Sequence, residues 1–238
     1  MKIPILGAKL KVNEKSPEAF IFPTGEFTGY WTEHELSYAL DNGYKILEIY
    51  KGAIFKNDGR IFKHYVEYFY EKRKNSDSSV DNIICKLLLN SLYGRFGMDT
   101  EKDQLHLEKR IEGEKYHSTV KTPTGKEFRF FTSSTEIETF SNVAVASYVT
   151  SYGRVKMHKF IKQLKEDVYY MDTDSLFTPK KLKEGKNLGD MKLEYSIERA
   201  VFLLPKTYLV ESNDFKKITM KGFDKKKIQH FSYSDFTN

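Results

Sequence analysis

Two aspartates separated by a single residue are candidates for chemistry in this sequence. Asp172 and Asp174 lie in VYYMDTDSLF (residues 168–177), between two short apolar runs, a pattern that predicts a β-hairpin with both carboxylates at its turn. A polar turn is one interpretation, because aspartate side chains bond nearby backbone donors. One half of a Mg²⁺ site is the other, because phosphoryl-transfer enzymes hold Mg²⁺ through carboxylates and substrate phosphates.

A second set of candidates lies in KLLLNSLYG (residues 86–94). On a helix, Lys86, Asn90 and Tyr93 fall within about 60° of one another. Apolar residues occupy roughly the opposite face: Ile84, Leu87 and Leu88. The polar face suits a nucleoside triphosphate, since an ammonium neutralises phosphates and a phenol offers a flat surface to a base. The alternative is an ordinary amphipathic helix that ends at Gly94.

The third pattern, LPKTYLV (residues 204–210), places Lys206 and Tyr208 on the same face of a predicted strand. Its alternative is an ordinary strand with an exposed lysine. The basic run at residues 72–74 also has two interpretations, a phosphate contact and a solvated surface.

The hydrophobic pattern predicts the helices that carry these residues. Helical periods cover residues 61–74, 80–93 and 141–164, and the first two predict an antiparallel helical hairpin. Thr32, with Glu35 three residues later, forms a capping box that opens another helix, which Asn42-Gly43 ends.

Strands are predicted between and after these helices. Aromatic runs around Pro23–Gly25 predict a hairpin, residues 45–55 predict one or two strands, and residues 121–131 predict a second hairpin. Two more strands are predicted around residues 206–211 and 216–222. No further element is predicted in the basic segment that ends the chain.

Composition narrows the class of protein. The 238 residues are 39% hydrophobic, which is enough for a core, and 39 Lys+Arg against 33 Asp+Glu give a net charge of +6 that suits a polyanionic partner or a solvated surface. Cys85 is the only cysteine, which excludes an internal disulfide and favours a reducing compartment. No apolar stretch approaches the ~18 residues of a membrane span, and the N-terminus does not read as a signal peptide, so neither a membrane nor a secreted location is expected.

In this order and at these spacings, K-x3-N-S-x-Y-G, Y-x-D-T-D-S and K-x-Y resemble the motif series of family B DNA polymerases. The wording is similar to the protein-primed branch found in bacteriophages and in linear plasmids, including mitochondrial ones. TSYGR (residues 150–154) resembles the T-x-x-[GA]-R primer-template motif of that branch, and MKGF (residues 220–223) resembles the exit toward its thumb.

The resemblance implies an α+β fold, with an antiparallel palm sheet, helical-hairpin fingers, β-rich insertions and only the start of a thumb. The implied division of the chain is a palm segment with a first insertion-like region (1–59), fingers (60–96), a second insertion-like β region (97–139), palm with the catalytic hairpin (140–222) and the start of the thumb (223–238).

The resemblance also implies a role for each candidate. Asp174 would bind metal directly in a two-metal Mg²⁺ site, with Asp172 as its supporting neighbour. The residues implied to contact the incoming dNTP are Lys86, Asn90, Tyr93 and Gly94. Those implied to contact primer-template DNA are Arg154, Lys206, Tyr208 and Lys221. Residues 10–31 stand where the branch meets its terminal priming protein.

One part of the family's site is missing from this sequence. The second metal-binding carboxylate belongs to an upstream D-x-x-S-L-Y-P segment, and no exonuclease D-x-E precedes the three motifs. We therefore expect a polymerase fragment that is inactive alone, with a non-catalytic remnant that binds primer-template or protein partners as the alternative. Richness in Lys, Asn, Ile, Phe and Tyr is typical of an AT-rich genome, such as that of a mitochondrion, a plasmid or a virus.

Overall fold

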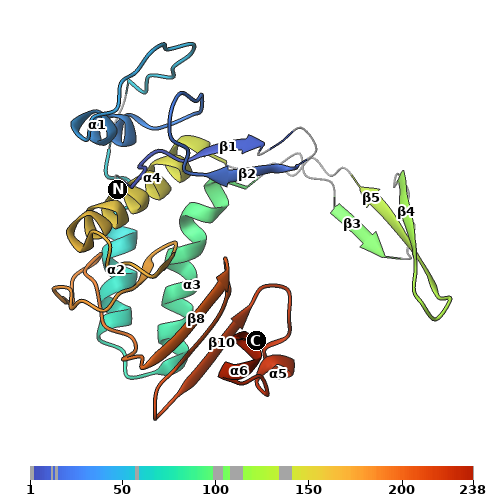
Figure 1. The fold of residues 1–238 in the computed structure, drawn as a ribbon. Helices are drawn as coiled ribbons and strands as arrows, with labels where there is room; N and C mark the ends of the chain where they lie inside the picture. Colours follow the sequence, from blue (N-terminus) through green and yellow to red (C-terminus); the bar gives the residue numbers. More distant parts are fainter. Residues whose placement is uncertain are drawn as a thin grey trace. The chain divides into compact units, whose positions relative to one another are not determined.

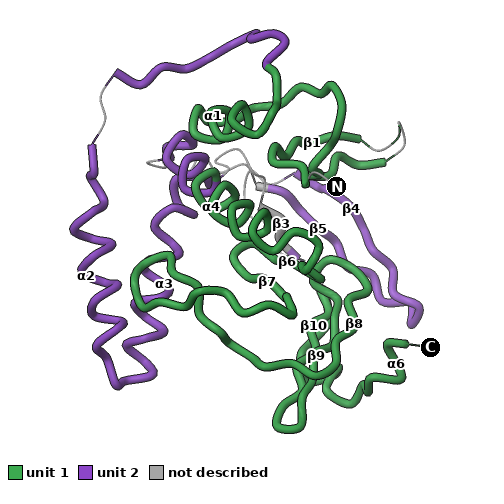
Figure 2. Tube along the Cα trace, turned by 60° about the vertical axis from the view of Figure 1, so that its left-hand side comes forward, with its two compact units in different colours: residues 1–45, 151–238 green, residues 46–150 purple. Residues whose placement is uncertain are grey.

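The computed structural model describes residues 3–11, 13, 16–56, 59–98, 104–107, 115–133 and 141–237. The chain divides into two compact units, coloured separately in Figure 2: unit 1 comprises Met1–Lys45 and Ser151–Asn238, and unit 2 comprises Ile46–Thr150. Unit 2 is thus inserted, along the chain, between the two segments of unit 1. Each unit is described by itself.

The first segment of unit 1 begins with a two-stranded sheet. β1 (Ala8–Lys11) and β2 (Glu18–Ile21) are antiparallel, with Ala8 opposite Ile21. The hairpin predicted around Pro23–Gly25 is wrong, because β2 pairs with the strand before it. Gly25 has a φ of 89°, and no strand follows it before α1 in the described residues.

A short helix completes this segment. α1 (Glu33–Asp41) begins where the Thr32 hydroxyl accepts the backbone N–H of Glu35, and it ends at Asn42, as the capping box and the Asn-Gly pair predict. Ala39 of α1 packs in a buried core with Ile5 and Leu6.

α4 (Val143–Leu164) confirms the helix predicted over residues 141–164. The boundary between the two units falls inside this helix, at Ser151. The part from Ser151 onward, which belongs to unit 1, carries the buried residues of α4: Ser151, Val155, Met157, His158, Ile161 and Leu164.

The second segment of unit 1 contains a hairpin and a three-stranded sheet. The hairpin is β6 (Tyr170–Asp172) with β7 (Ser175–Phe177). The sheet has the antiparallel order β10-β9-β8, formed by β8 (Arg199–Leu204), β9 (Thr207–Glu211) and β10 (Lys216–Met220). Its centre is fully buried at Leu209 and Val210.

Two short helices pack on this sheet, beside β10 and β8 in Figure 1: α5 (Lys225–Ile228) and α6 (Tyr233–Thr237). The expectation of no further element here is wrong. Asp224 caps α5 by accepting the Lys226 backbone N–H at 2.9 Å, and Ile228 and Phe236 are buried. These two buried apolar residues anchor a segment that is mainly basic and polar.

Unit 2 contains the predicted helical hairpin, formed by α2 (Lys63–Lys74) and α3 (Ser79–Phe96) (Figure 1). The Tyr65 hydroxyl donates to the Leu88 carbonyl at 3.2 Å, and the rings of Phe62 and Phe96 are 5.2 Å apart. The start of α2 thus lies beside the end of α3, which confirms the antiparallel arrangement.

The sheet of unit 2 has the order β3-β5-β4. Its strands are β3 (Gln104–Leu107), β4 (Lys115–Lys121) and β5 (Glu127–Ser133). Lys121 pairs with Glu127, which confirms the hairpin predicted over residues 121–131. Other parts of the predicted region 97–139 lie outside the described residues.

The strands predicted over residues 45–55 are wrong. This stretch forms neither helix nor strand, and its apolar side chains are exposed, Ile54 to 93%. A strand needs a neighbouring backbone for its hydrogen bonds, and no described residue pairs with this stretch.

Candidate functional site

The acidic hairpin of unit 1 has the predicted shape. Asp172 ends β6 and pairs with Ser175 of β7, so Thr173 and Asp174 form the turn between them. Thr173 has a φ of 54°, and the backbone N–H of Asp174 donates to the Asp172 carbonyl at 2.6 Å. This tight turn places the two carboxylates at one end of the hairpin.

An aromatic cluster underlies the hairpin. Tyr170 stacks on Phe202 of β8 with ring centroids 4.9 Å apart and planes 6° apart. Phe177 and Tyr208 complete the cluster, with centroid distances of 5.0 Å from Phe177 to Phe202 and 5.4 Å from Tyr170 to Tyr208. Tyr208 is only 7% exposed. These rings fix the hairpin against β8 and β9.

Lys206 lies in the turn between β8 and β9, not within the strand that its spacing from Tyr208 predicted. With a φ of 60°, the backbone of Lys206 adopts the left-handed conformation. Its ammonium donates to both carboxylate oxygens of Asp172, at 2.7 and 2.6 Å. This hydrogen bond lowers the pKa of the Asp172 carboxyl and raises the pKa of Lys206.

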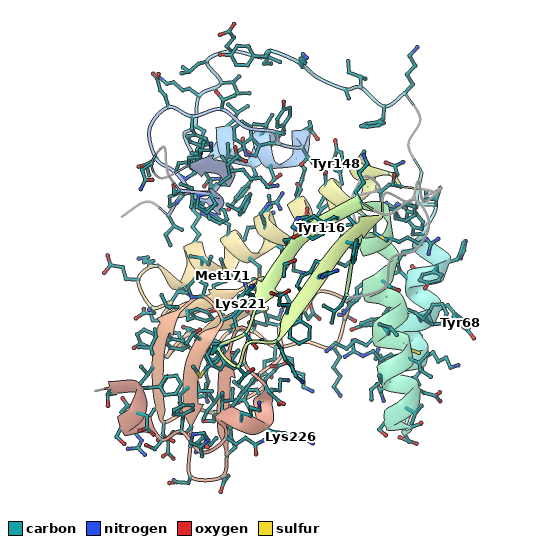
Figure 3. All side chains as sticks on the ribbon, turned by 90° about the vertical axis from the view of Figure 1, so that its right-hand side faces the viewer. Tyr68, Tyr116, Tyr148, Met171, Lys221 and Lys226 are labelled. Carbon is teal, nitrogen blue, oxygen red and sulfur yellow. The ribbon has the colours of Figure 1, made fainter. Side chains whose placement is uncertain are left out.

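Lys221 lies beside Lys206. Its backbone N–H, just after β10, donates to the Lys206 carbonyl at 3.0 Å, and its exposed side chain is labelled in Figure 3. Unit 1 therefore brings together five of the predicted residues: Asp172, Asp174, Lys206, Tyr208 and Lys221.

The donor set of the hairpin fits one half of a Mg²⁺ site. Mg²⁺ prefers oxygen ligands and is commonly held by one or two carboxylates. Asp174 is exposed, and no described residue forms a hydrogen bond or ion pair with its carboxylate. Asp172 is already bound by Lys206. Within the described ranges, no cluster of three or more His, Cys, Asp or Glu side chains is present.

The predicted nucleotide contacts lie on α3 in unit 2. Lys86, Asn90, Tyr93 and Gly94 are all exposed. The predicted packing face is wrong for Ile84 and Leu87, since Leu87 is 66% exposed and Ile84 is also exposed, whereas Leu88 is half-buried and Cys85 is 1% exposed. The contact of Tyr65 with Leu88 shows why: α2 covers the side of α3 that includes Leu88.

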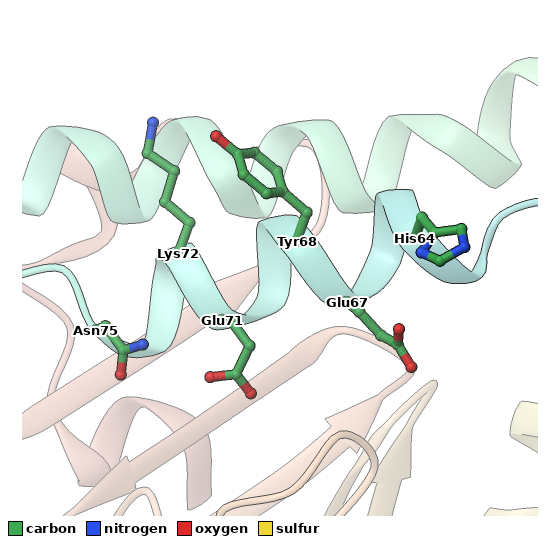
Figure 4. A pocket seen from close by; sticks show the side chains of 6 residues that line it. All are labelled: His64, Glu67, Tyr68, Glu71, Lys72 and Asn75. Atoms are coloured by element: carbon green, nitrogen blue, oxygen red, sulfur yellow. The ribbon is translucent and has the colours of Figure 1, made fainter.

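α2 bears a hollow of about 460 Å³ (Figure 4), lined by His64, Glu67, Tyr68, Glu71, Lys72 and Asn75. In Figure 4, Tyr68 and Lys72 project to one side of α2, while Glu67 and Glu71 project to the other. Two carboxylates disfavour a phosphate in this hollow, and Glu71 also lies 4.0 Å from Lys74. A phosphate contact by residues 72–74 stays a prediction.

Arg154 lies on α4 and binds Glu35 of α1. Its Nε and Nη2 donate to the two Glu35 oxygens at 2.6 and 2.9 Å. Glu35 is 2% exposed, and the Arg154 side chain is 32% exposed. The sequence predicted Glu35 only as a capping residue. The signal that could have revealed the pair is the position of Glu35 on the apolar face of the predicted helix, because a carboxylate buried there needs a cationic partner.

The Glu35–Arg154 pair belongs to a ladder between α1 and α4. The other pairs are Thr32–Ser151 at 2.5 Å, Tyr38–His158 at 3.1 Å and Asn42–Lys162 at 2.7 Å. Partners are separated by 119 or 120 residues in every pair. The constant separation means that the two helices run parallel, with one polar pair per turn.

By fold and site, the chain is a mixed helix-and-sheet protein whose acidic hairpin is chemically suited to a divalent cation. It belongs to the family described as DNA polymerase type B, organellar and viral, whose profile matches residues 1–178. Lys206, Tyr208 and Lys221 lie beyond that match.

The sequence is similar to those of fungal and phage polymerases. The chain is 30% identical over 211 residues to the "Probable DNA polymerase" of Neurospora intermedia, covering 83% of the chain and 22% of that protein. It is 30% identical to the corresponding protein of Ascobolus immersus, covering 87% and 18%. The DNA polymerase of Bacillus phage phi29 is 24% identical, covering 99% and 39%. The chain thus spans well under half the length of these curated relatives.

The fold is similar to that of phi29 DNA polymerase complexed with primer-template DNA, with a TM-score of 0.57 and 19% identity. The similarity covers 74% of this chain and 33% of the phage chain. Among the described helices, none is both long and apolar enough to cross a membrane.

Proposed function

We propose that this chain is part of a template-directed DNA polymerase that adds nucleotides from dNTPs to a primer 3′-OH by two-metal nucleotidyl transfer. The observation that carries the proposal is the Asp172–Asp174 hairpin of a chain of this family, whose Asp174 carboxylate has no hydrogen-bond or ion-pair partner among the described residues. The hairpin and its neighbouring sheet would be the palm, and the α2–α3 pair the fingers.

Asp174, supported by Asp172, would hold Mg²⁺, with the second carboxylate supplied from outside this chain. Bound Mg²⁺ would stabilise the negative charge that develops during transfer. The residues of this chain bind and orient the reactants: Lys86 would neutralise dNTP phosphates, and Asn90, Tyr93 and Gly94 would lie against the nucleotide. Their common exposure on α3 supports this role.

Primer-template DNA would lie over the β8–β9 turn, which contains Lys206, and over Lys221. The backbones of these two lysines are hydrogen-bonded to each other, so their ammonium groups belong to neighbouring residues of one sheet. Because the ring of Tyr208 is buried, that residue would act by bracing the turn, with its hydroxyl as the group nearest the primer. The phosphate charge of DNA makes such binding strongly salt-dependent.

The proposal extends to the setting of the enzyme. Relatives from fungi and from phages favour a plasmid or viral gene, with the mitochondrion as compartment if the plasmid is organellar. Residues 10–31 would face a terminal priming protein. The implied division into palm, fingers, insertions and the start of a thumb at residues 1–59, 60–96, 97–139, 140–222 and 223–238 is part of the same proposal.

The decisive test is Asp174→Ala in a polymerase that carries this chain together with an upstream metal-binding aspartate. Primer extension should fall to background while affinity for primed DNA changes less than about twofold, because Asp174 serves the metal and not DNA binding. Asp214→Ala, at an exposed carboxylate between β9 and β10, is the matched control and should retain extension.

Near-normal extension by the Asp174 variant would reject the metal assignment. The 238-residue chain alone should bind primed DNA weakly and should not extend it. If the longer wild-type polypeptide also bound primed DNA without extending it, the non-catalytic alternative would be correct.

A further inference from the structure

Lys206 forms hydrogen bonds with both ends of β6. Its backbone N–H donates to the hydroxyl of Tyr170, the first residue of β6, at 2.8 Å. Its ammonium binds both oxygens of Asp172, the last residue of β6. One residue of the β8–β9 turn therefore fixes the whole strand that leads to the acidic turn.

The backbone of Lys206 is held in an unusual conformation for this purpose. A φ of 60° is unfavourable for a residue with a side chain and persists only where surrounding contacts impose it. Both backbone polar groups of Lys206 have partners: the N–H bonds Tyr170, and the carbonyl accepts from Lys221 at 3.0 Å. Tyr170 is itself fixed by its stacking on Phe202.

The two carboxylates consequently have opposite surroundings. Asp172 accepts from Lys206 and, at 3.0 Å, from the Thr173 hydroxyl. No described residue forms a hydrogen bond or ion pair with the Asp174 side chain. Since Lys206 uses two of its three N–H donors on Asp172, one donor is left for any other partner.

We propose that Lys206 is a positioning residue for the metal-binding hairpin: it serves as the counter-ion of Asp172 and anchors Tyr170, so that cation binding falls to Asp174. This inference rests on the proposed function for the identity of the cation. It gives Lys206 a role beyond the primer contact that the family resemblance implied. It also predicts an unusual result, because removing Lys206 should strengthen the binding of a divalent cation.

The test is Mn²⁺ binding to the full 238-residue chain, followed by the electron paramagnetic resonance signal of free Mn²⁺. Lys206→Met should tighten binding by roughly two- to fivefold, the factor that corresponds to loss of an exposed ion pair. Lys206→Arg keeps the charge and should stay near wild type. Lys221→Met is the matched control, because it removes an equal charge from a residue whose backbone contacts Lys206. Its Mn²⁺ affinity should stay close to that of the wild type.

The aspartates provide the second arm. Asp174→Asn should weaken Mn²⁺ binding at least about tenfold, as expected for a lost charged ligand, and Asp172→Asn should weaken it less, by roughly two- to fivefold, because the Lys206 ammonium is then left without its counter-ion beside the site. Fluorescence of Trp31, the single tryptophan, checks that each variant is folded.

Three outcomes would overturn the inference: equal effects of Lys206→Met and Lys221→Met, no effect of Lys206→Met, or equal losses in the two aspartate variants. If Asp174→Asn left Mn²⁺ binding unchanged, the metal site of the proposed function would itself be wrong. If Asp174→Asn weakened Mn²⁺ binding but Lys206→Met did not change it, only the role proposed for Lys206 would be rejected.

Discussion

The buried ion pair between Glu35 and Arg154 should be far more sensitive to loss of the arginine than to loss of the glutamate. Arg154→Met leaves the Glu35 carboxylate, which is 2% exposed, without a partner. Breaking a buried pair in this way costs about 3–5 kcal/mol of unfolding free energy. Glu35→Gln leaves a guanidinium whose side chain is 32% exposed and reaches water, so its cost is about 1.5–3 kcal/mol, that of lost charged hydrogen bonds.

Urea unfolding at pH 7, followed by Trp31 fluorescence, measures both variants. Trp31 lies in unit 1 with the pair, and its indole N–H donates to Gly7 at 2.8 Å. The double variant Glu35→Gln/Arg154→Met should be more stable than the sum of the single losses by about 1–3 kcal/mol, the coupling of contacting residues. The control is Asp167→Asn, which removes the exposed ion pair with Lys180 and should cost at most about 1 kcal/mol.

The reasoning would be refuted if Glu35→Gln cost more than Arg154→Met, or if the two losses were additive. Either result would mean that the carboxylate is hydrated in solution and that the ladder between α1 and α4 does not depend on charge.

Three further predictions concern the hairpin and the fingers. Because the pKa of Asp172 is lowered, its ion pair with Lys206 stabilises the fold fully above the unfolded aspartate pKa of about 3.9. Because the pKa of Lys206 is raised, the same stabilisation is lost only when the pH rises past about 10.4. The difference in unfolding free energy between wild type and Lys206→Met, about 0.5–1 kcal/mol at pH 7, should therefore vanish near pH 2; an unchanged difference there would contradict the pairing. Tyr170→Phe removes the acceptor of the Lys206 N–H and should cost about 1 kcal/mol in the same urea assay, and a variant as stable as wild type would show that water replaces the hydroxyl. In an active polymerase that carries this chain, Lys86→Ala should raise the apparent KM for dNTP at least about tenfold with a smaller effect on kcat, and steady-state kinetics with an unchanged KM would exclude a phosphate contact.

Elements with local signals were predictable from the sequence. The cap at Thr32, the helical periods of α2 and α3 and the hairpin at Asp172–Asp174 all depend on residues within a few positions of one another. The motif spacing also identified the family, because it does not require knowledge of the packing.

Elements that depend on distant partners were not predictable. Residues 45–55 have the apolar content of a strand but no paired backbone in the described residues. The buried face of α3 is set by α2, and the left-handed turn at Lys206 is set by Tyr170 and Lys221. Glu35 shows the same limit, since its partner Arg154 is 119 residues away.

The ladder between α1 and α4 has a consequence for synthesis on the ribosome. Each of its pairs joins residues 119 or 120 positions apart. At about 5–20 residues per second, α1 emerges roughly 6–24 s before its partner helix has been made. During that interval Glu35 has no Arg154 to bind, and all of unit 2 is translated. The first segment of unit 1 therefore completes its folding only after unit 2 has left the ribosome, and it is the part of the nascent chain for which a chaperone has the longest time to act.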